Sequence, residues 1–448
     1  MAKNILIIIP LSVIFALSLL FDYRATFVFF PMVIYLFVIV KGEQYIKEFY
    51  IFIYLFLSGA ADRFYFPILG SQSINFLGII NFLIILTFFL KLQNFTKIES
   101  ECWNKSIIYP VFLLVFVLIL PTPLSVSVSD SIRGLNRMLS AFSLYLIIYF
   151  MTIRYSEEKT FKLITCVFFF LSIYGIIEYF TGFNLLQNSP TTYFAYKGYE
   201  VIGSFDRIKT TFSCAPHYAF VILTFLPLFL YYSTKKNNLL YVCLVVLLFI
   251  NLILTFTRIA WIAVVIQLAF FCIFFYSRKQ LIIFLLLIPV VIIMSSKVMD
   301  RLQVDGSAEL RVSLFKYALS IFMSKPLLGS GLGTFFGLSS KAFGHSFAPH
   351  GDYMKMFAET GAVGGLSYLI LLFSNLIFAI INLKKNDFAK ISVITIIGFM
   401  IFSITDNALG YSHIFWALLG IYNGLLVREN HQKVVSLSSK PHVFAIER

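Results

Sequence analysis

The sequence is poor in charged residues. Asp, Glu, Lys and Arg make up 12% of its 448 residues, whereas hydrophobic residues make up 60%. A soluble domain carries about a quarter charged residues, so this composition excludes a soluble protein. The apolar runs are continuous rather than alternating, which excludes a β-barrel. The composition therefore predicts an all-α polytopic membrane protein.

Patterns that bind metals or form disulfides are also scarce. The five cysteines are scattered without a CxxC pair, and the histidine spacing fits no standard zinc site. The acidic residues of the polar regions form no DxD pair that could hold a diphosphate through a divalent cation. We therefore expect no metal and no cofactor, with arginines as the counter-charges of an anionic ligand.

Long apolar segments are what the chain has in abundance. Segments of roughly 20 apolar residues can cross a bilayer, and here they predict about twelve to fourteen transmembrane helices within a single transmembrane domain, residues 1–448. The candidates lie at about 5–21, 25–40, 46–62, 74–90, 107–122, 138–153, 161–180, 216–232, 239–256, 259–276, 281–296, 361–382, 390–406 and 411–427.

Lysine and arginine are concentrated in alternate short connections, such as KGEQYIKE, STKKNN and LKKNDFAK. Because cytoplasmic connections carry the excess of these residues, the pattern places both termini, including the tail at 428–448, in the cytoplasm. It places the 181–215 loop and the long 297–360 loop outside. This bias, together with an anionic lipid-linked substrate, explains the net charge of +14 better than nucleic acid does.

The most polar region of the chain lies between Lys297 and Glu359, with long apolar segments on both sides. Its charges and irregular backbone would be unsatisfied in hydrocarbon, so we expect a long extracytoplasmic loop that carries short helices. The segment SAELRVSLFKYALSIF has the apolar spacing of an amphipathic helix. We expect Arg311 in its first turn, where the alternatives to ligand binding are a solvated charge or an ion pair with Glu309 or Asp305.

Arginines of the other outer connections fall on the same side of the membrane as Arg311. Arg258 lies between two apolar runs, where an arginine is costly unless it meets water, a headgroup or a partner. A guanidinium binds phosphate oxygens through paired donors, and the alternative is snorkelling to lipid headgroups. Arg207 and Lys209 form a small basic cluster before a span, for which the same two interpretations hold.

His350 and two glycines complete the candidate residues. The imidazole of His350 titrates near neutral pH, which suits proton transfer from a sugar hydroxyl, although a loop histidine is more often a polar surface residue. Gly331 and Gly333 lie in GSGLGTFFG, which lacks the βαβ context of a dinucleotide site. These glycines would either approach a phosphate or form a structural turn.

Three segments occur in order around the long outer loop: TFTRIAWIA, then ELR followed by SKPLLGSGLGTF, then PHGDYMKMFAETGAVGGL. Together they resemble the signature region of the O-antigen ligase and O-antigen polymerase superfamily, over residues 251–372. The resemblance implies a metal-independent, inverting glycosyltransferase of the GT-C type whose donor is a glycan on undecaprenyl diphosphate. By matching position, Arg258 and Arg311 would bind the diphosphate and His350 would activate the acceptor hydroxyl, with Arg207 as a further phosphate contact.

Members of the superfamily differ in their acceptor. We favour a polymerase that joins repeat units of O-antigen, capsule or exopolysaccharide, and a ligase acting on lipid A–core or a protein glycosyltransferase is the alternative. The expected partners are the undecaprenyl-diphosphate-linked oligosaccharide, an acceptor glycan, the lipid bilayer and a chain-length regulator. The expected location is the bacterial cytoplasmic (inner) membrane, with the active site facing the periplasm or exterior.

A polysaccharide or lipid transporter is the alternative from a different class of protein. Such transporters often show two-fold repeats with broken helices in matching halves. The sequence shows no such repeat, and its polar residues concentrate in the C-terminal half. A purely structural scaffold would not account for the arginines.

Overall fold

The computed structural model describes residues 45–61, 65–69, 72–96, 103–182, 207–212, 214–235, 238–275, 307–411 and 413–438. Within these ranges the protein is all-helical apart from one antiparallel hairpin of β1 (Tyr65–Leu69) and β2 (Gln72–Asn75). The predicted spans at 5–21, 25–40 and 281–296 lie outside the described residues.

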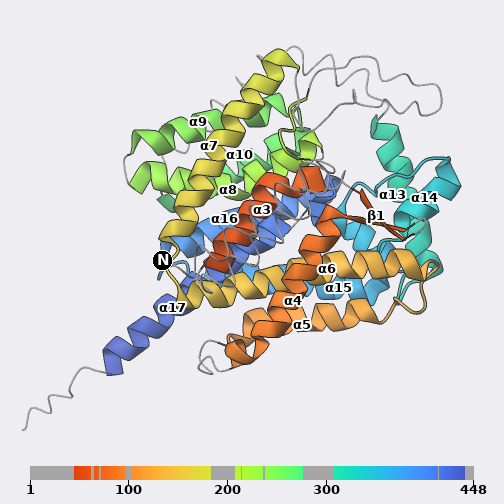
Figure 1. Ribbon diagram of the computed structural model, residues 1–448, viewed down its shortest axis with the longest axis horizontal. Coiled ribbons are helices and arrows are strands. Elements are labelled where there is room, and N and C mark those ends of the chain that lie inside the picture. Colours follow the sequence, from red (N-terminus) through yellow and green to blue (C-terminus); the bar gives the residue numbers. More distant parts are fainter. Residues whose placement is uncertain are drawn as a thin grey trace, which may run out of the picture.

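The helices follow the predicted apolar segments closely. Among the described residues, α6, α7, α8, α10, α15 and α16 are the six helices long and apolar enough to cross a membrane. This confirms a polytopic membrane protein, whose arrangement is shown in Figure 1. The helices are α3 (Ile46–Ala61), α4 (Phe76–Thr96), α5 (Lys105–Ile119), α6 (Val128–Arg154), α7 (Glu158–Thr181), α8 (Ala215–Lys235), α9 (Leu239–Leu254), α10 (Arg258–Phe275), α13 (Ser307–Ser324), α14 (Phe335–Phe343), α15 (Asp352–Ile381), α16 (Asp387–Thr405), the 3-10 helix η3 (Ala408–Tyr411) and α17 (His413–Ser438).

Helix α6 begins earlier than predicted, at Val128 rather than near residue 138. The side chain of Ser127 accepts a hydrogen bond from the Asp130 backbone N–H and caps the helix. The first turns carry the charged residues Asp130, Arg133 and Arg137, so a search for a continuous apolar segment does not include them. The connection left between the predicted spans at 107–122 and 138–153 is therefore helical over its second half.

The predicted loop at 297–360 contains α13 and α14 and leads into α15 before the predicted span begins. Helix α15 starts at Asp352 and is interrupted at Gly361, where φ is 66° and ψ is −168°. That conformation is accessible to glycine at little cost. The break falls where the apolar span was predicted to start, so the turns before it belong to the polar region.

Aromatic packing joins the central helices. Trp416 of α17 is fully buried and meets Phe142 and Tyr145 of α6 and Phe399 of α16 edge-on. The backbones of α6 and α17 also approach closely, since a Cβ at Gly420 would come within 2.7 Å of the Tyr145 carbonyl oxygen. This close approach makes α6 and α17 a rigid pair that connects the two ends of the bundle.

One end of the bundle gathers connections that were predicted to be cytoplasmic. Arg428 of α17 pairs with Glu157, which lies between α6 and α7. Lys47 at the start of α3 donates to the Ser156 carbonyl at 3.1 Å. We call this the Arg428 end, and in Figure 1 the C-terminal part of α17 leaves the bundle on this side, at lower left.

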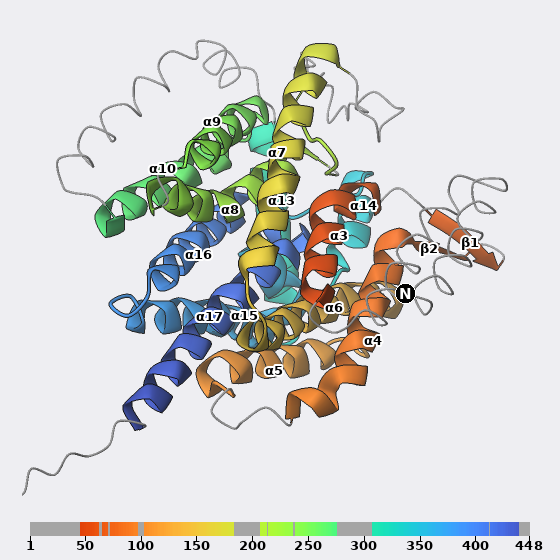
Figure 2. The ribbon, with the colours of Figure 1, turned by 60° about the vertical axis from the view of Figure 1, so that its left-hand side comes forward.

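The other end gathers connections that were predicted to be outside. The Val126 N–H donates to the Ser330 carbonyl at 2.9 Å, and the Leu409 N–H donates to Asp352 Oδ2 at 2.8 Å. We call this the His350 end. Helices α13 and α14 lie here, on the right in Figure 1, and Figure 2 shows the hairpin of β1 and β2 at the edge of the molecule.

Candidate functional site

His350 lies in the turn that connects α14 to α15, next to the end of α16. The following residue, Gly351, has a φ of 131°, and a Cβ there would lie 2.7 Å from the Ile404 carbonyl oxygen. Only glycine fits this conformation at this distance. The half-buried imidazole is thereby fixed against the bundle, and its Nδ1 is buried without a hydrogen-bond partner among the described residues.

The surroundings of His350 keep its imidazole neutral. Burial lowers the pKa of His350, and the positive charge of Arg311 lowers it further, to about 4. Both effects disfavour the protonated form. At neutral pH the imidazole is thus uncharged and able to accept a proton, as a general base must.

The charge of Arg311 acts on His350 because three helices pack together. Buried apolar side chains of α13, α14 and α15, including Leu314, Phe335 and Ala358, form a small core of their own. Arg311 is exposed on α13, in its second turn rather than the predicted first, because the helix begins at Ser307. Within the described part of the chain it forms no hydrogen bond or ion pair, so the alternative pairing with Glu309 is not made, and Asp305 lies outside the described residues.

Arg207 and Arg258 are held at a second place on the same end. Arg207 Nε donates to the Thr255 carbonyl at 2.8 Å, and Nη2 donates to Thr257 Oγ1 at 3.1 Å. Arg258 is the half-buried first residue of α10, directly after Thr257. Two connections far apart in sequence are therefore joined, as the shared side of the membrane predicted.

Lys209 follows Arg207 in the same connection. Its backbone N–H lies 3.4 Å from Glu178 Oε2, and the Thr210 N–H donates to the same oxygen at 2.7 Å. The contacts thus tie the predicted residues into two groups: His350 with Arg311, and Arg207 and Lys209 with the turn that precedes Arg258.

Gly331 and Gly333 form a turn that is packed between α6 and α15. The Gly331 N–H donates to the Glu359 carbonyl at 2.8 Å, and the Gly333 N–H donates to Glu359 Oε2 at 2.8 Å. A side chain at Gly331 would meet that of Ser125, and a Cβ at Gly333 would lie 2.9 Å from the Asp130 carbonyl oxygen. Because both N–H groups are used within the protein, the geometry favours the structural interpretation of these glycines over phosphate contact.

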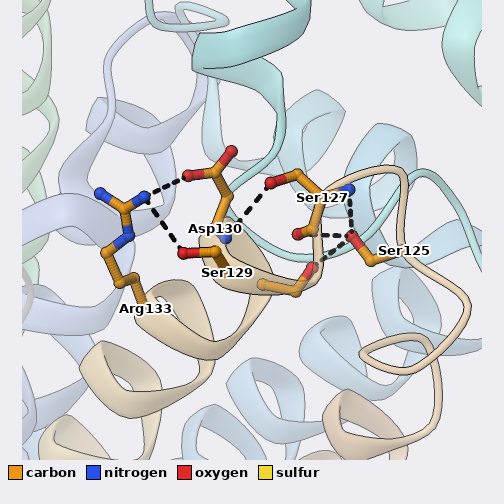
Figure 3. A network of polar contacts seen from close by, with 6 residues as sticks. Ser125, Ser127, Ser129, Asp130 and Arg133 are labelled. Carbon is orange, nitrogen blue, oxygen red and sulfur yellow. Dashed lines mark hydrogen bonds and ion pairs between the residues drawn. The ribbon is translucent and has the colours of Figure 1, made fainter.

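The surface that receives the glycine turn is the start of α6 (Figure 3). Ser125 Oγ donates to the Ser127 carbonyl at 2.9 Å and also approaches the Ser330 carbonyl at 3.2 Å. Arg133 pairs with Asp130 at 2.9 Å on the outer side of this network. The network fixes the glycine turn, and with it Glu359, close to the His350 turn.

Sequence reasoning missed Arg137, which lies inside α6. Its charge acts on the buried Glu359 and on His413 at the start of α17. His413 is itself bonded to Ser140, with Nε2 at 2.9 Å from Oγ. The predicted start of α6 placed Arg137 in a loop, so no helical spacing connected it to these partners.

Within the described residues, no group of three or more His, Cys, Asp or Glu side chains is placed to hold a metal ion.

Part of the chain, including this site, matches the model of a known protein family. No curated protein matches the chain. Residues 243–369 match the family model described as O-antigen ligase, and they include Arg258, Arg311 and His350. The match confirms the resemblance seen in the sequence and supports a place for this chain in the O-antigen ligase and polymerase superfamily of membrane glycosyltransferases.

Proposed function

We propose that this protein transfers a glycan from undecaprenyl diphosphate to an acceptor hydroxyl on the extracytoplasmic face of the bacterial cytoplasmic membrane. The observation that carries the proposal is the neutral, half-buried His350 beside Arg311 within the O-antigen ligase domain. The imidazole of His350 can deprotonate a neutral acceptor. Arg311, which has no ion-pair partner among the described residues, can bind an anionic donor next to it. We favour polymerisation of surface-polysaccharide repeat units.

The chemistry requires one base and a stabilised leaving group. The acceptor hydroxyl gives its proton to the imidazole of His350 as its oxygen attacks the anomeric carbon. The bond from that carbon to the phosphate oxygen breaks, and the diphosphate leaves with the electron pair from the opposite face, which inverts the configuration. Arg311 and Arg258 offset the developing negative charge without a metal, with Arg207 and Lys209 as further phosphate contacts, and His350 then returns the proton to water.

The same proposal orients the protein. The Arg428 end, which gathers the basic connections, faces the cytoplasm together with both termini, and the His350 end faces the periplasm or exterior. The lipid-linked donor then reaches the site from the outer leaflet of the membrane. A chain-length regulator would meet the protein on this side.

Complementation of a deletion strain tests this function. The strain is complemented with wild type, with His350→Ala and with the matched control His345→Ala, which removes an exposed histidine from the same loop. Lipid-linked repeat units and surface polysaccharide are then separated on gels. We expect wild type and His345→Ala to restore long chains and His350→Ala to leave single repeat units on the final acceptor.

Other outcomes identify the alternatives. Long chains that accumulate on undecaprenyl diphosphate and never reach lipid A–core would indicate a ligase of the same superfamily. If neither pool changes on deletion, the transferase proposal is wrong. A loss of exported lipid-linked units would then favour the transporter.

A further inference from the structure

Lys355, in the first turn of α15, is a buried cation that sequence reasoning did not single out. Its side chain is only 9% exposed, and its Nζ lies 5.8 Å from the centre of the Phe336 ring of α14. Among the described residues no hydrogen bond or ion pair involves this ammonium group. An ammonium carries three donors, and none of them is satisfied by a described residue here.

Two buried carboxylates lie on the same face of α15 but do not bond to Lys355. The positive charge of Lys355 acts on both of them, on Asp352 one turn before and on Glu359 one turn after. Their oxygens accept backbone N–H groups instead: that of Leu409 for Asp352, and those of Gly333 and Phe335 for Glu359. The acids therefore make the site tolerant of a cation, while the three donors of the ammonium remain available.

Lys355 is attached to the same turn as His350. The Lys355 N–H donates to the carbonyl of Gly351, the residue directly after His350, at 3.1 Å. The ring of Phe336 lies against the ammonium from the α14 side. An anion bound to Lys355 would thus lie at the His350 end.

We infer that Lys355 binds the phosphate oxygens of the lipid-linked diphosphate donor, an inference that rests on the proposed function. An ammonium is a compact charge that suits a phosphate oxygen, and its burial places it before the donor arrives. Arg311, which is exposed, then contributes a second cation. In the complex the phosphate oxygens supply the acceptors that no described residue supplies to the ammonium.

Binding of undecaprenyl diphosphate to the purified full-length protein tests the inference. The protein is placed in phosphatidylcholine nanodiscs, and affinity is measured for wild type, Lys355→Met and the control Lys341→Met, which removes an exposed lysine of α14. We expect Lys355→Met to weaken binding by about 10-fold or more, as loss of a hydrogen bond to a charged group predicts. Lys341→Met should bind as wild type does, and undecaprenol, which has no phosphate, should bind weakly to every variant.

Each remaining outcome has one meaning. Equal affinity of Lys355→Met and wild type overturns the role of Lys355 but leaves the proposed function standing, whereas no binding to wild type contradicts the proposed function itself. Displacement of the diphosphate by an equal concentration of phosphatidylglycerol would show a general headgroup site and also overturn the inference. If Lys355→Met aggregates, Lys355→Met with Glu359→Gln preserves the charge balance and carries the same prediction, with Glu359→Gln alone as its control.

Discussion

The two ends of the bundle use the same residue types in different ways. At the Arg428 end, cations form salt bridges. Arg428 pairs with Glu157, and Asp387 pairs with both Lys235 and Lys390. At the His350 end, Arg311 and Lys355 form no ion pair within the described residues, although the exposed Arg133 does. The salt bridges of the Arg428 end hold neighbouring helices together, whereas Arg311 and Lys355 are available to an anionic ligand.

This difference also explains why the two ends should respond differently to mutation. Removal of a paired charge leaves its partner exposed or buried without compensation, which affects stability. Removal of an unpaired cation at the His350 end relieves charge in the free protein and removes an interaction only in the complex. Substitutions at the two ends should therefore separate stability from transfer.

After His350 itself, the largest effect on transfer is expected at Arg311. Arg311→Met should lower the transfer rate by about 100-fold, because one preorganised counter-charge of the leaving diphosphate is lost. Loss of the charge also removes one of the two causes that lower the pKa of His350, so that pKa rises. The fall of activity on acidification should then begin at a higher pH than in wild type, as a rate profile would show.

A control on the same helix isolates this effect. Lys316→Met removes an exposed positive charge from α13 and should leave both the rate and the pH profile unchanged. If Lys316→Met and Arg311→Met behave alike, the effect is one of overall charge, and the pairing of Arg311 with His350 has no part in it.

The next effect concerns the structural role of the glycine turn. Gly331 has a φ of 110° and faces Ser125, whereas Gly344 has a φ of 76° and a Cβ added there would meet nothing within 4 Å. Gly344→Ala should lower the free energy of unfolding by the backbone cost alone, about 1 kcal/mol, and Gly331→Ala by about 1–3 kcal/mol more. Thermal unfolding in detergent compares the two, and equal losses would mean that the Ser125 contact is unimportant.

Arg428→Met should act on stability alone. Besides its pair with Glu157, Arg428 donates to the carbonyls of Thr152 and Tyr155 at 3.2 Å. Because the pair is partly exposed, we expect a loss of about 1–2 kcal/mol in the free energy of unfolding. Transfer measured at a temperature where the variant is folded should equal that of wild type, and a selective loss of transfer would show that the Arg428 end takes part in catalysis.

The smallest effect is expected at Thr257. Thr257→Val removes the hydroxyl that accepts from Arg207 Nη2 but keeps the bond from Nε to the Thr255 carbonyl. Loss of one hydrogen bond of this kind is worth about 1 kcal/mol, so donor affinity should fall by a few fold. An unchanged affinity would indicate that Arg207 is positioned by Thr255 alone.

Properties that depend on local composition could be predicted from the sequence. The apolar segments and the alternation of basic connections predicted one shared side of the membrane for Arg207, Arg258, Arg311 and His350. The structure joins Arg207 to the turn before Arg258. Contacts between distant elements could not be predicted. The hydrogen bond from the Gly333 N–H to Glu359 depends on a turn packed against α15. Among the described residues Lys355 has no acceptor, and the carboxylates next to it accept backbone N–H groups from two other connections.

The most direct test of the account is transfer by the purified full-length protein in proteoliposomes with undecaprenyl-diphosphate-linked repeat units. Chain lengthening is followed by gel for wild type, His350→Ala and His345→Ala across the pH range. We predict that His350→Ala lowers the rate by about 10²- to 10⁴-fold without loss of donor binding. Wild type should stay active as the pH falls and should lose activity only as the pH approaches about 4, where His350 becomes protonated. A His350→Ala variant that lengthens chains at the wild-type rate would contradict the account.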